Sequence, residues 1–78
     1  MRQKKPTLIV TFLTTTQAMA VEKHCMEHGL PGRMIPVPRE ITAGCGLSWK
    51  ADPADRDLLR QALESAGLQW EAMYVIEI

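Results

Sequence analysis

Residues 7–14 read TLIVTFLT, an almost unbroken run of β-branched and apolar side chains. Such a run is typical of a buried strand. A helix is expected directly after it, because Thr15 and Thr16 are good N-cap residues and Gly29 can end the helix. The predicted apolar stripe of this helix consists of Ala18, Val21, Cys25 and Met26.

Two shorter strands are predicted in the middle of the chain. Residues 33–37 are rich in apolar side chains, and residues 46–51 alternate between apolar and polar positions. Pro36 and Pro38 lack backbone donors, so the first of these strands is expected to lie at a sheet edge or to end there. The residues between the two strands, 39–45, are expected to form a loop.

The last third of the chain predicts a second helix and a final strand. Asp52 followed by Pro53 is typical of a helix start, and Gly67 is typical of a helix end. Residues 70–77 alternate in the manner of a strand. The predicted apolar stripe of the second helix consists of Leu59, Ala62, Leu63 and Ala66.

The elements come in the order β-α-β-β-α-β. This order predicts one α+β domain of the ferredoxin-like type over residues 1–78, with residues 1–6 as a disordered N-terminal segment. Right-handed crossovers put both helices on one face of a four-stranded antiparallel sheet. The other face is expected to be less covered, with Thr11, Trp49 or Tyr74 on it. A second copy of the chain could shield that face in a homodimer.

The charge balance argues against several classes of function. The 78 residues include 9 Lys plus Arg and 9 Asp plus Glu, whereas a nucleic-acid binder usually has a clear basic excess. No apolar stretch reaches the ~18 residues that a membrane span needs. With 46% hydrophobic and 23% charged residues, the composition is that of a globular protein. We therefore expect neither a nucleic-acid nor a membrane partner.

The N-terminus imitates a secretory signal. Residues 1–5 are basic, residues 8–13 are apolar, and Ala18-Met19-Ala20 resembles a cleavage site. The apolar core is short, however, and cleavage there would remove the best strand from a chain that has little core to spare. A cytoplasmic protein is therefore expected.

The most unusual stretch is IPVPREITAGCG, residues 35–46. Cys45 lies between Gly44 and Gly46, which allow a tight turn with converging backbone N–H groups and leave the sulfur accessible. Arg39 could add positive charge, which favours a thiolate. Cys45 is thus a candidate reactive thiol. In the other interpretation the glycines only make the turn, and Cys45 is a small apolar residue in the core.

The other candidate residues have structural interpretations. Cys25 falls on a predicted core stripe and is expected to pack there. His24 and His28 stand at i,i+4 spacing, but Glu27 points elsewhere and no third ligand has a recognisable spacing, so no metal site is predicted. The acidic residues Asp52, Asp55 and Asp57 suit a helix start. Core packing is expected for Met19, Met26, Met34 and Met73.

Two sequence motifs, together with the last helix and strand, carry a resemblance to a known family over nearly the whole chain. Residues 12–18 read FLTTTQA, with Glu22-Lys23 after them, and residues 36–47 read PVPREITAGCGL, a Pro-x-Pro-Arg stretch followed by a Cys-Gly pair. Together with the late helix and the Tyr-containing last strand, they resemble a small bacterial family of selenium/sulfur carrier-like proteins. The resemblance implies that Cys45 holds the sulfur or selenium. Its implied surroundings are Arg39, Thr42, Gly44 and Gly46.

The leading hypothesis is therefore a cytoplasmic sulfur or selenium carrier, rather than a catalyst. It would act between a donor of the desulfurase type and an acceptor protein, without a cofactor. The chain lacks the Cys-Pro-x-Pro motif of better-known sulfur-relay carriers. The alternative hypothesis is a non-catalytic interaction module, or a regulatory module that binds a small ligand, in which Cys45 is inert. A third hypothesis is a thiol redox sensor with Cys25 as the resolving cysteine.

Overall fold

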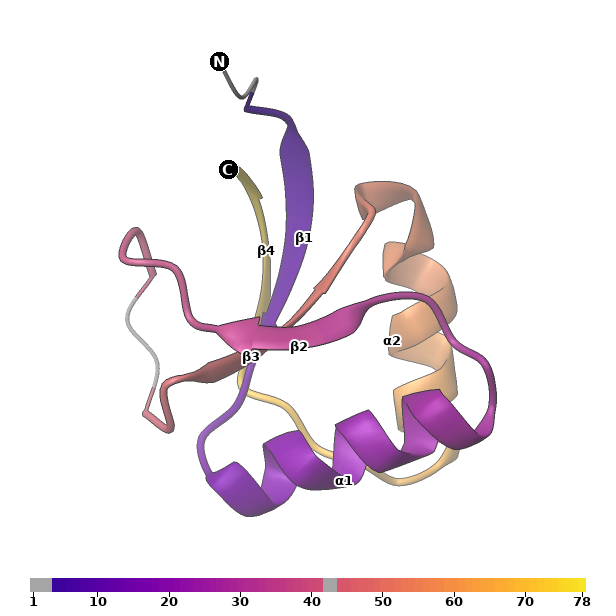
Figure 1. Cartoon of the computed structure of the whole chain (residues 1–78). Coiled ribbons are helices and arrows are strands. Elements are labelled where there is room, and N and C mark those ends of the chain that lie inside the picture. Colours follow the sequence, from indigo (N-terminus) through magenta and orange to yellow (C-terminus); the bar gives the residue numbers. More distant parts are fainter. Residues whose placement is uncertain (1–3, 42–43) are drawn as a thin grey trace.

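The computed structural model describes residues 4–41 and 44–78. This part of the chain forms two α-helices and a four-stranded sheet (Figure 1). Its order confirms the predicted βαββαβ arrangement. The elements are β1 (Pro6–Thr11), α1 (Thr15–Glu27), β2 (Arg33–Pro36), β3 (Leu47–Ala51), a 3₁₀ turn (Pro53–Asp55), α2 (Arg56–Ser65) and β4 (Ala72–Glu77).

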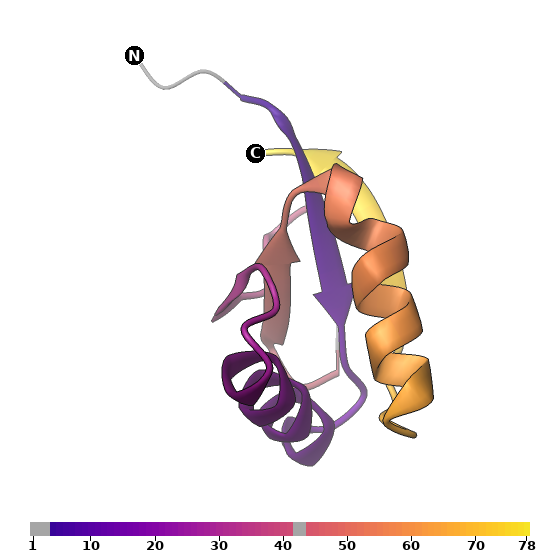
Figure 2. The same ribbon diagram turned by 90° about the vertical axis from the view of Figure 1, so that its right-hand side faces the viewer.

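The sheet has the strand order β2-β3-β1-β4, and each neighbouring pair is antiparallel. The central strand β1 pairs with β3 on one side and with β4 on the other; Leu8, for example, lies between Ala51 and Val75. β2 lies at a sheet edge, as Pro36 and Pro38 predicted. Figure 2 looks from the helix side of the sheet and shows α2 upright at the right and α1 at the lower left, with β1 visible between them.

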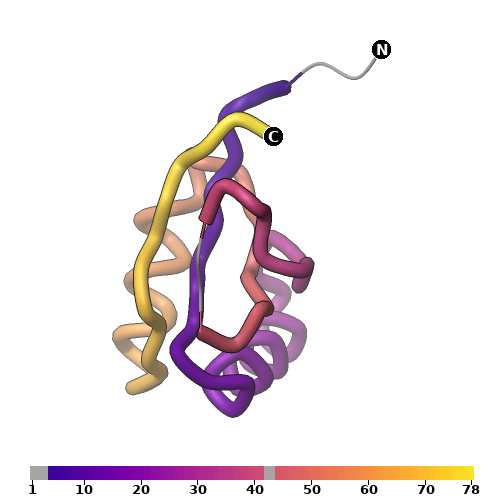
Figure 3. The backbone as a smooth tube through the Cα atoms, turned by 90° about the vertical axis from the view of Figure 1, so that its left-hand side faces the viewer, coloured from indigo at the N-terminus to yellow at the C-terminus, as the bar shows by residue number. Residues whose placement is uncertain are grey.

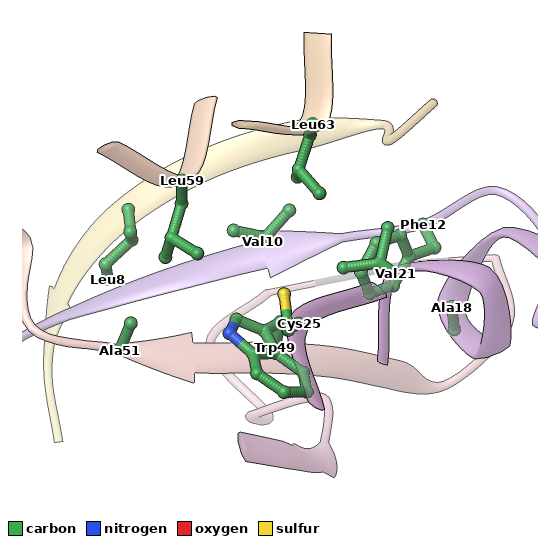
Figure 4. Packing of buried hydrophobic residues seen from close by; sticks show 10 residues of the cluster. All are labelled: Leu8, Val10, Phe12, Ala18, Val21, Cys25, Trp49, Ala51, Leu59 and Leu63. Carbon is green, nitrogen blue, oxygen red and sulfur yellow. The ribbon is translucent and has the colours of Figure 1, made fainter. Parts of the chain in front are cut away.

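The core lies between the sheet and the two helices (Figure 4). In β1 and just beyond it, every second residue points into this layer, and Leu8, Val10 and Phe12 are fully buried. Burying one such side chain contributes roughly 1.5–3 kcal/mol to folding. The rest of the buried cluster consists of Ala18, Val21 and Cys25 of α1, Trp49 and Ala51 of β3, and Leu59 and Leu63 of α2.

Trp49 lies in this core, so of the three residues considered for the less covered face it is the one that does not lie there. Its exposed fraction is 3%, and it is paired with Val10 across the β1–β3 ladder, so both side chains point toward the helices. Its indole N–H donates to the carbonyl oxygen of Pro31 at 3.0 Å. This hydrogen bond satisfies the one polar group that burial of the indole would otherwise leave without a partner.

α1 differs from the prediction in its N-cap residue and in which of its side chains are buried. The N-cap is Thr14 rather than Thr15 or Thr16, and its side chain accepts a hydrogen bond from the backbone of Gln17. Met19 and Met26 are 56% and 73% exposed, so they are not core residues. α1 buries only a narrow stripe against the sheet, and both methionines lie outside it. Met34 and Met73 do pack against the core, as predicted.

α2 begins one turn later than predicted. Asp52 caps the short 3₁₀ turn that starts at Pro53, by accepting a hydrogen bond from the Ala54 N–H at 2.8 Å, and the α-helix follows this turn. Of its predicted apolar stripe, Leu59 and Leu63 are buried, Ala62 is half-buried, and Ala66 beyond the helix end is exposed.

The face of the sheet opposite the helices is not bare. Ile9 and Thr11 of β1 point to that face and are both 0% exposed. Figures 1 and 3 show that the connection between β2 and β3 lies over this side of the sheet, away from the helices. Ile41, in the middle of that connection, is also buried. Tyr74 of β4 points to the same face, as predicted, and is 40% exposed at the far edge.

Gly32 is the residue that allows the chain to enter β2. Its φ angle is +112°, a conformation that side-chain-bearing residues rarely adopt. A Cβ atom at this position would overlap the indole of Trp49 and the carbonyl oxygen of Lys50. Gly29 also has a positive φ of +63°, but a Cβ there would meet no atom within 4 Å.

The two glycines form a matched pair for a stability test. Gly29→Ala adds only left-handed backbone strain and should cost about 1 kcal/mol. Gly32→Ala adds a clash with the core tryptophan as well and should cost about 3 kcal/mol. Urea unfolding of both variants measures the two losses. Equal losses would show that the close packing of Gly32 on Trp49 does not stabilise the fold.

Candidate functional site

The candidate site lies in the connection between β2 and β3. We call its described residues, 37–41 and 44–46, the thiol loop. The backbone N–H of Val37 donates to the carbonyl oxygen of Gly46 at 2.9 Å and closes the loop at its base. Within it, the Ile41 N–H donates to the Pro38 carbonyl oxygen at 3.0 Å, which forms a turn. The side chain of Ile41, the last residue of this turn, is buried.

Cys45 is a half-buried free thiol at the end of the thiol loop. Its side chain packs against the edge of the core cluster, and its sulfur lies 3.6 Å from the carbonyl oxygen of Leu47, to which the thiol donates. The sulfur is therefore held against β3, while the residue as a whole remains in partial contact with solvent.

The two glycines beside Cys45 have different surroundings. A Cβ atom on Gly44 would lie 3.1 Å from the carbonyl oxygen of Leu13, so this glycine allows the thiol loop to pack closely on the segment between β1 and α1. Gly46 has a φ angle of +76°, and a Cβ there would meet nothing within 4 Å. Cys45 thus has a tightly packed neighbour on one side and an open one on the other.

Gln17 holds the segment on which Gly44 packs. Its backbone N–H donates to the Thr14 hydroxyl at 3.1 Å, and its side-chain oxygen accepts from the Leu13 N–H at 3.0 Å. Its side-chain amide also donates to the Gln69 side chain at 3.3 Å, before β4. The arrangement is close to a capping box, in which the third residue of the helix reaches back to the cap.

These supporting residues were not predicted as part of the site. The sequence signal was present, because Thr14-x-x-Gln17 has the spacing of a capping box. Thr15 and Thr16, however, competed with Thr14 as N-caps, and nothing in the sequence indicated that Leu13 would contact the residue before Cys45. That contact joins residues 13 and 44, which are distant along the chain.

The structure does not bring all the predicted site residues together. Gly44, Cys45 and Gly46 are adjacent, but Arg39 is an exposed residue of the 38–41 turn. Figures 1 and 3 show this turn and the 44–46 segment apart from each other, the turn above and the segment below. Thr42 lies outside the described residues.

Cys25 differs from Cys45 in its burial. It lies in the last turn of α1 and is 0% exposed, which confirms its predicted place in the core. Burial disfavours the thiolate and raises the pKa of the Cys25 thiol above its usual value. Cys45 therefore provides the accessible sulfur of the two.

The two histidines lie on one side of α1. The ring centroids of His24 and His28 are 4.2 Å apart. Throughout residues 4–41 and 44–78, no three His, Cys, Asp or Glu side chains are grouped so that they could hold a metal ion. In the same residues, no helix has the length and apolar character needed to cross a membrane.

The sequence matches one known protein family over most of its length. Residues 7–75 match the family described as "Putative Se/S carrier protein-like". The chain belongs to this family. Its match extends from β1 into β4 and includes the thiol loop and the Leu13–Gln17 segment that supports it. Comparison of this Se/S carrier-like chain with curated proteins and with solved structures gave no match.

The burial of the two sulfurs predicts which one is alkylated in the folded Se/S carrier-like protein. With iodoacetamide in native buffer, one equivalent should add to Cys45, whereas Cys25 should react only after denaturation, because its sulfur is inaccessible and its pKa is raised. Peptide mass mapping locates the label. Labelling of Cys25 at the rate of Cys45 would contradict the described packing of α1.

Proposed function

We propose that this protein carries sulfur or selenium on Cys45, as a persulfide or a selenosulfide. The main support is the contrast between its two thiols, of which Cys45 is in partial contact with solvent in a surface loop and Cys25 is fully buried. Membership of the Se/S carrier-like family supports the same function. Carrying the chalcogen requires one accessible thiol and no metal or organic cofactor.

The loading step is a thiol–disulfide exchange. The Cys45 thiol gives its proton to solvent, and the thiolate attacks the terminal sulfur of a donor persulfide. A new S–S bond forms to Cys45 while the S–S bond of the donor breaks, and the donor leaves as a thiolate. Transfer to an acceptor thiolate repeats the exchange and restores the free Cys45 thiol. Selenium would follow the same path with an S–Se bond.

The asymmetry of the loop suits such an exchange. On the Gly44 side, the backbone packs on Leu13 and fixes the position of the thiol. On the Gly46 side, a Cβ atom would meet nothing within 4 Å beyond its chain neighbours, so the surface beside Cys45 is open to an approaching partner. We expect the backbone N–H groups of this segment, together with Arg39 and Thr42, to contact the cargo or the partner.

The partners that this chemistry requires are a donor and an acceptor protein. A donor of the cysteine desulfurase type supplies sulfane sulfur as an enzyme persulfide, and the acceptor takes it up with a thiolate. The proposed place of action is the cytoplasm, where thiols are kept reduced. In this scheme the protein transfers a group without transforming a substrate, so it is a carrier and not an enzyme.

Intact-mass analysis after incubation with a cysteine desulfurase and cysteine tests the loading step. The wild-type protein and Cys25→Ala should gain the mass of one sulfur atom, and dithiothreitol should remove it. Cys45→Ser should gain nothing, because the remaining thiol is buried. Absence of added sulfur in the wild-type protein, or equal loading of Cys45→Ser, would contradict the proposal and favour the interaction module with an inert Cys45.

A further inference from the structure

A hollow lies at the end of the sheet opposite the thiol loop. β3 ends at Ala51, which is paired with Leu8. β1 begins two residues before Leu8, at Pro6, and Lys5 before it still pairs with Ile78 after the end of β4. The space beside the first residues of β1 therefore has no strand in it. The hollow has a volume of about 340 Å³. We call it the basic notch, and the lining residues that matter are Lys5, Thr7, Arg33, Lys50, Asp52 and Asp55.

Two cations face each other in the wall of the basic notch. Arg33 of β2 and Lys50 of β3 are direct cross-strand partners, so their side chains leave the sheet on the same face. Like charges in this arrangement repel and destabilise a sheet. Lys5 lines the same hollow. The described residues contain one salt bridge, between Arg60 and Glu64, so these three cations are not ion-paired within that part of the chain.

The backbone around the basic notch is held in place before any ligand arrives. Lys5 exchanges two hydrogen bonds with Ile78, of 3.4 and 3.3 Å, which extend the β1–β4 ladder. On the other wall, the Trp49 indole binds the Pro31 carbonyl oxygen at the entrance to β2. A site on fixed backbone loses little entropy when it binds, so even a small ligand can be held.

The acidic residues limit the charge of a ligand. The side chain of Asp52 is committed to the 3₁₀ turn, since it accepts the Ala54 N–H at 2.8 Å. Asp55 adds a second carboxylate to the lining. Three cations against two carboxylates leave an excess of one positive charge in a chain whose formal net charge is zero. This favours one oxyanion group and disfavours a polyanion such as nucleic acid.

We propose that the basic notch binds a small anion through a single phosphate or carboxylate group. Such a group, placed between Arg33 and Lys50, replaces their mutual repulsion by two charge-assisted interactions, and the planar guanidinium can donate to two of its oxygens at once. Lys5, directly before β1, adds a third cation to the lining. The basic notch and Cys45 lie at opposite ends of β3, so this binding does not depend on the thiol.

An NMR titration at constant ionic strength tests the proposal, with inorganic phosphate and acetate as probes and chloride as the balancing anion. One of the two probes should saturate with a Kd of about 1–10 mM. The largest shifts should fall on the amides of residues 31–33 and 50–52. Arg33→Gln and Lys50→Gln should each weaken binding about tenfold, without lowering the unfolding temperature, because each removes a repulsion. Lys23→Gln on the polar side of α1 is the matched charge control and should bind as the wild type does.

The two probes also separate the sources of the oxyanion. Saturation by phosphate alone indicates a phosphate-bearing ligand, and saturation by acetate alone indicates a carboxylate. The proposal is wrong if neither probe gives saturable shifts below about 50 mM. It is equally wrong if Lys23→Gln weakens binding as much as Arg33→Gln does, because the effect would then be general screening. Cys45→Ser should bind the probe unchanged, whether or not it accepts sulfur.

Discussion

β1 is buried on both of its faces, and the rest of the structure follows from that constraint. Leu8, Val10 and Phe12 are covered by the helices, as the βαββαβ order requires. Ile9 and Thr11 point the other way and are equally buried, so the opposite face also needs a cover. The thiol loop lies over that face and buries one isoleucine of its own (Figure 3). The loop that carries the thiol is therefore also part of the packing of the fold.

The two ends of the sheet carry different side chains: a thiol at one end and a group of cations at the other. The difference arises because β1 and β3 are not of equal extent. Where β1 ends and β3 begins, the short connection to α1 carries the Leu13 carbonyl on which Gly44 packs, which holds Cys45 beside an open position. At the other end, β3 ends opposite Leu8, whereas β1 begins at Pro6. The space left there is lined by cations from β2, from β3 and from the residue before β1. A domain of 78 residues is too small for a deep cleft between lobes, so its sites lie at such sheet ends.

Much of the fold could be predicted from the sequence, because strand alternation, helix caps and glycine stops are local signals. The same signals placed Cys25 in the core and β2 at an edge. They failed for Trp49, whose face depends on the strand register, and for Met19 and Met26, since helical spacing alone does not tell how wide a stripe a helix buries. The contact between Gly44 and Leu13 joins distant parts of the chain, so no local pattern could have indicated it.

The most direct test of carriage is release of the cargo after loading. The protein would be loaded with radiolabelled sulfur, freed of the donor, and mixed with glutathione as the acceptor thiol. The label should pass to glutathione faster as the acceptor becomes more ionised with rising pH, and the protein mass should return to that of the free thiol. Label that stays on Cys45 across this pH range would show a modified cysteine and would contradict a carrier.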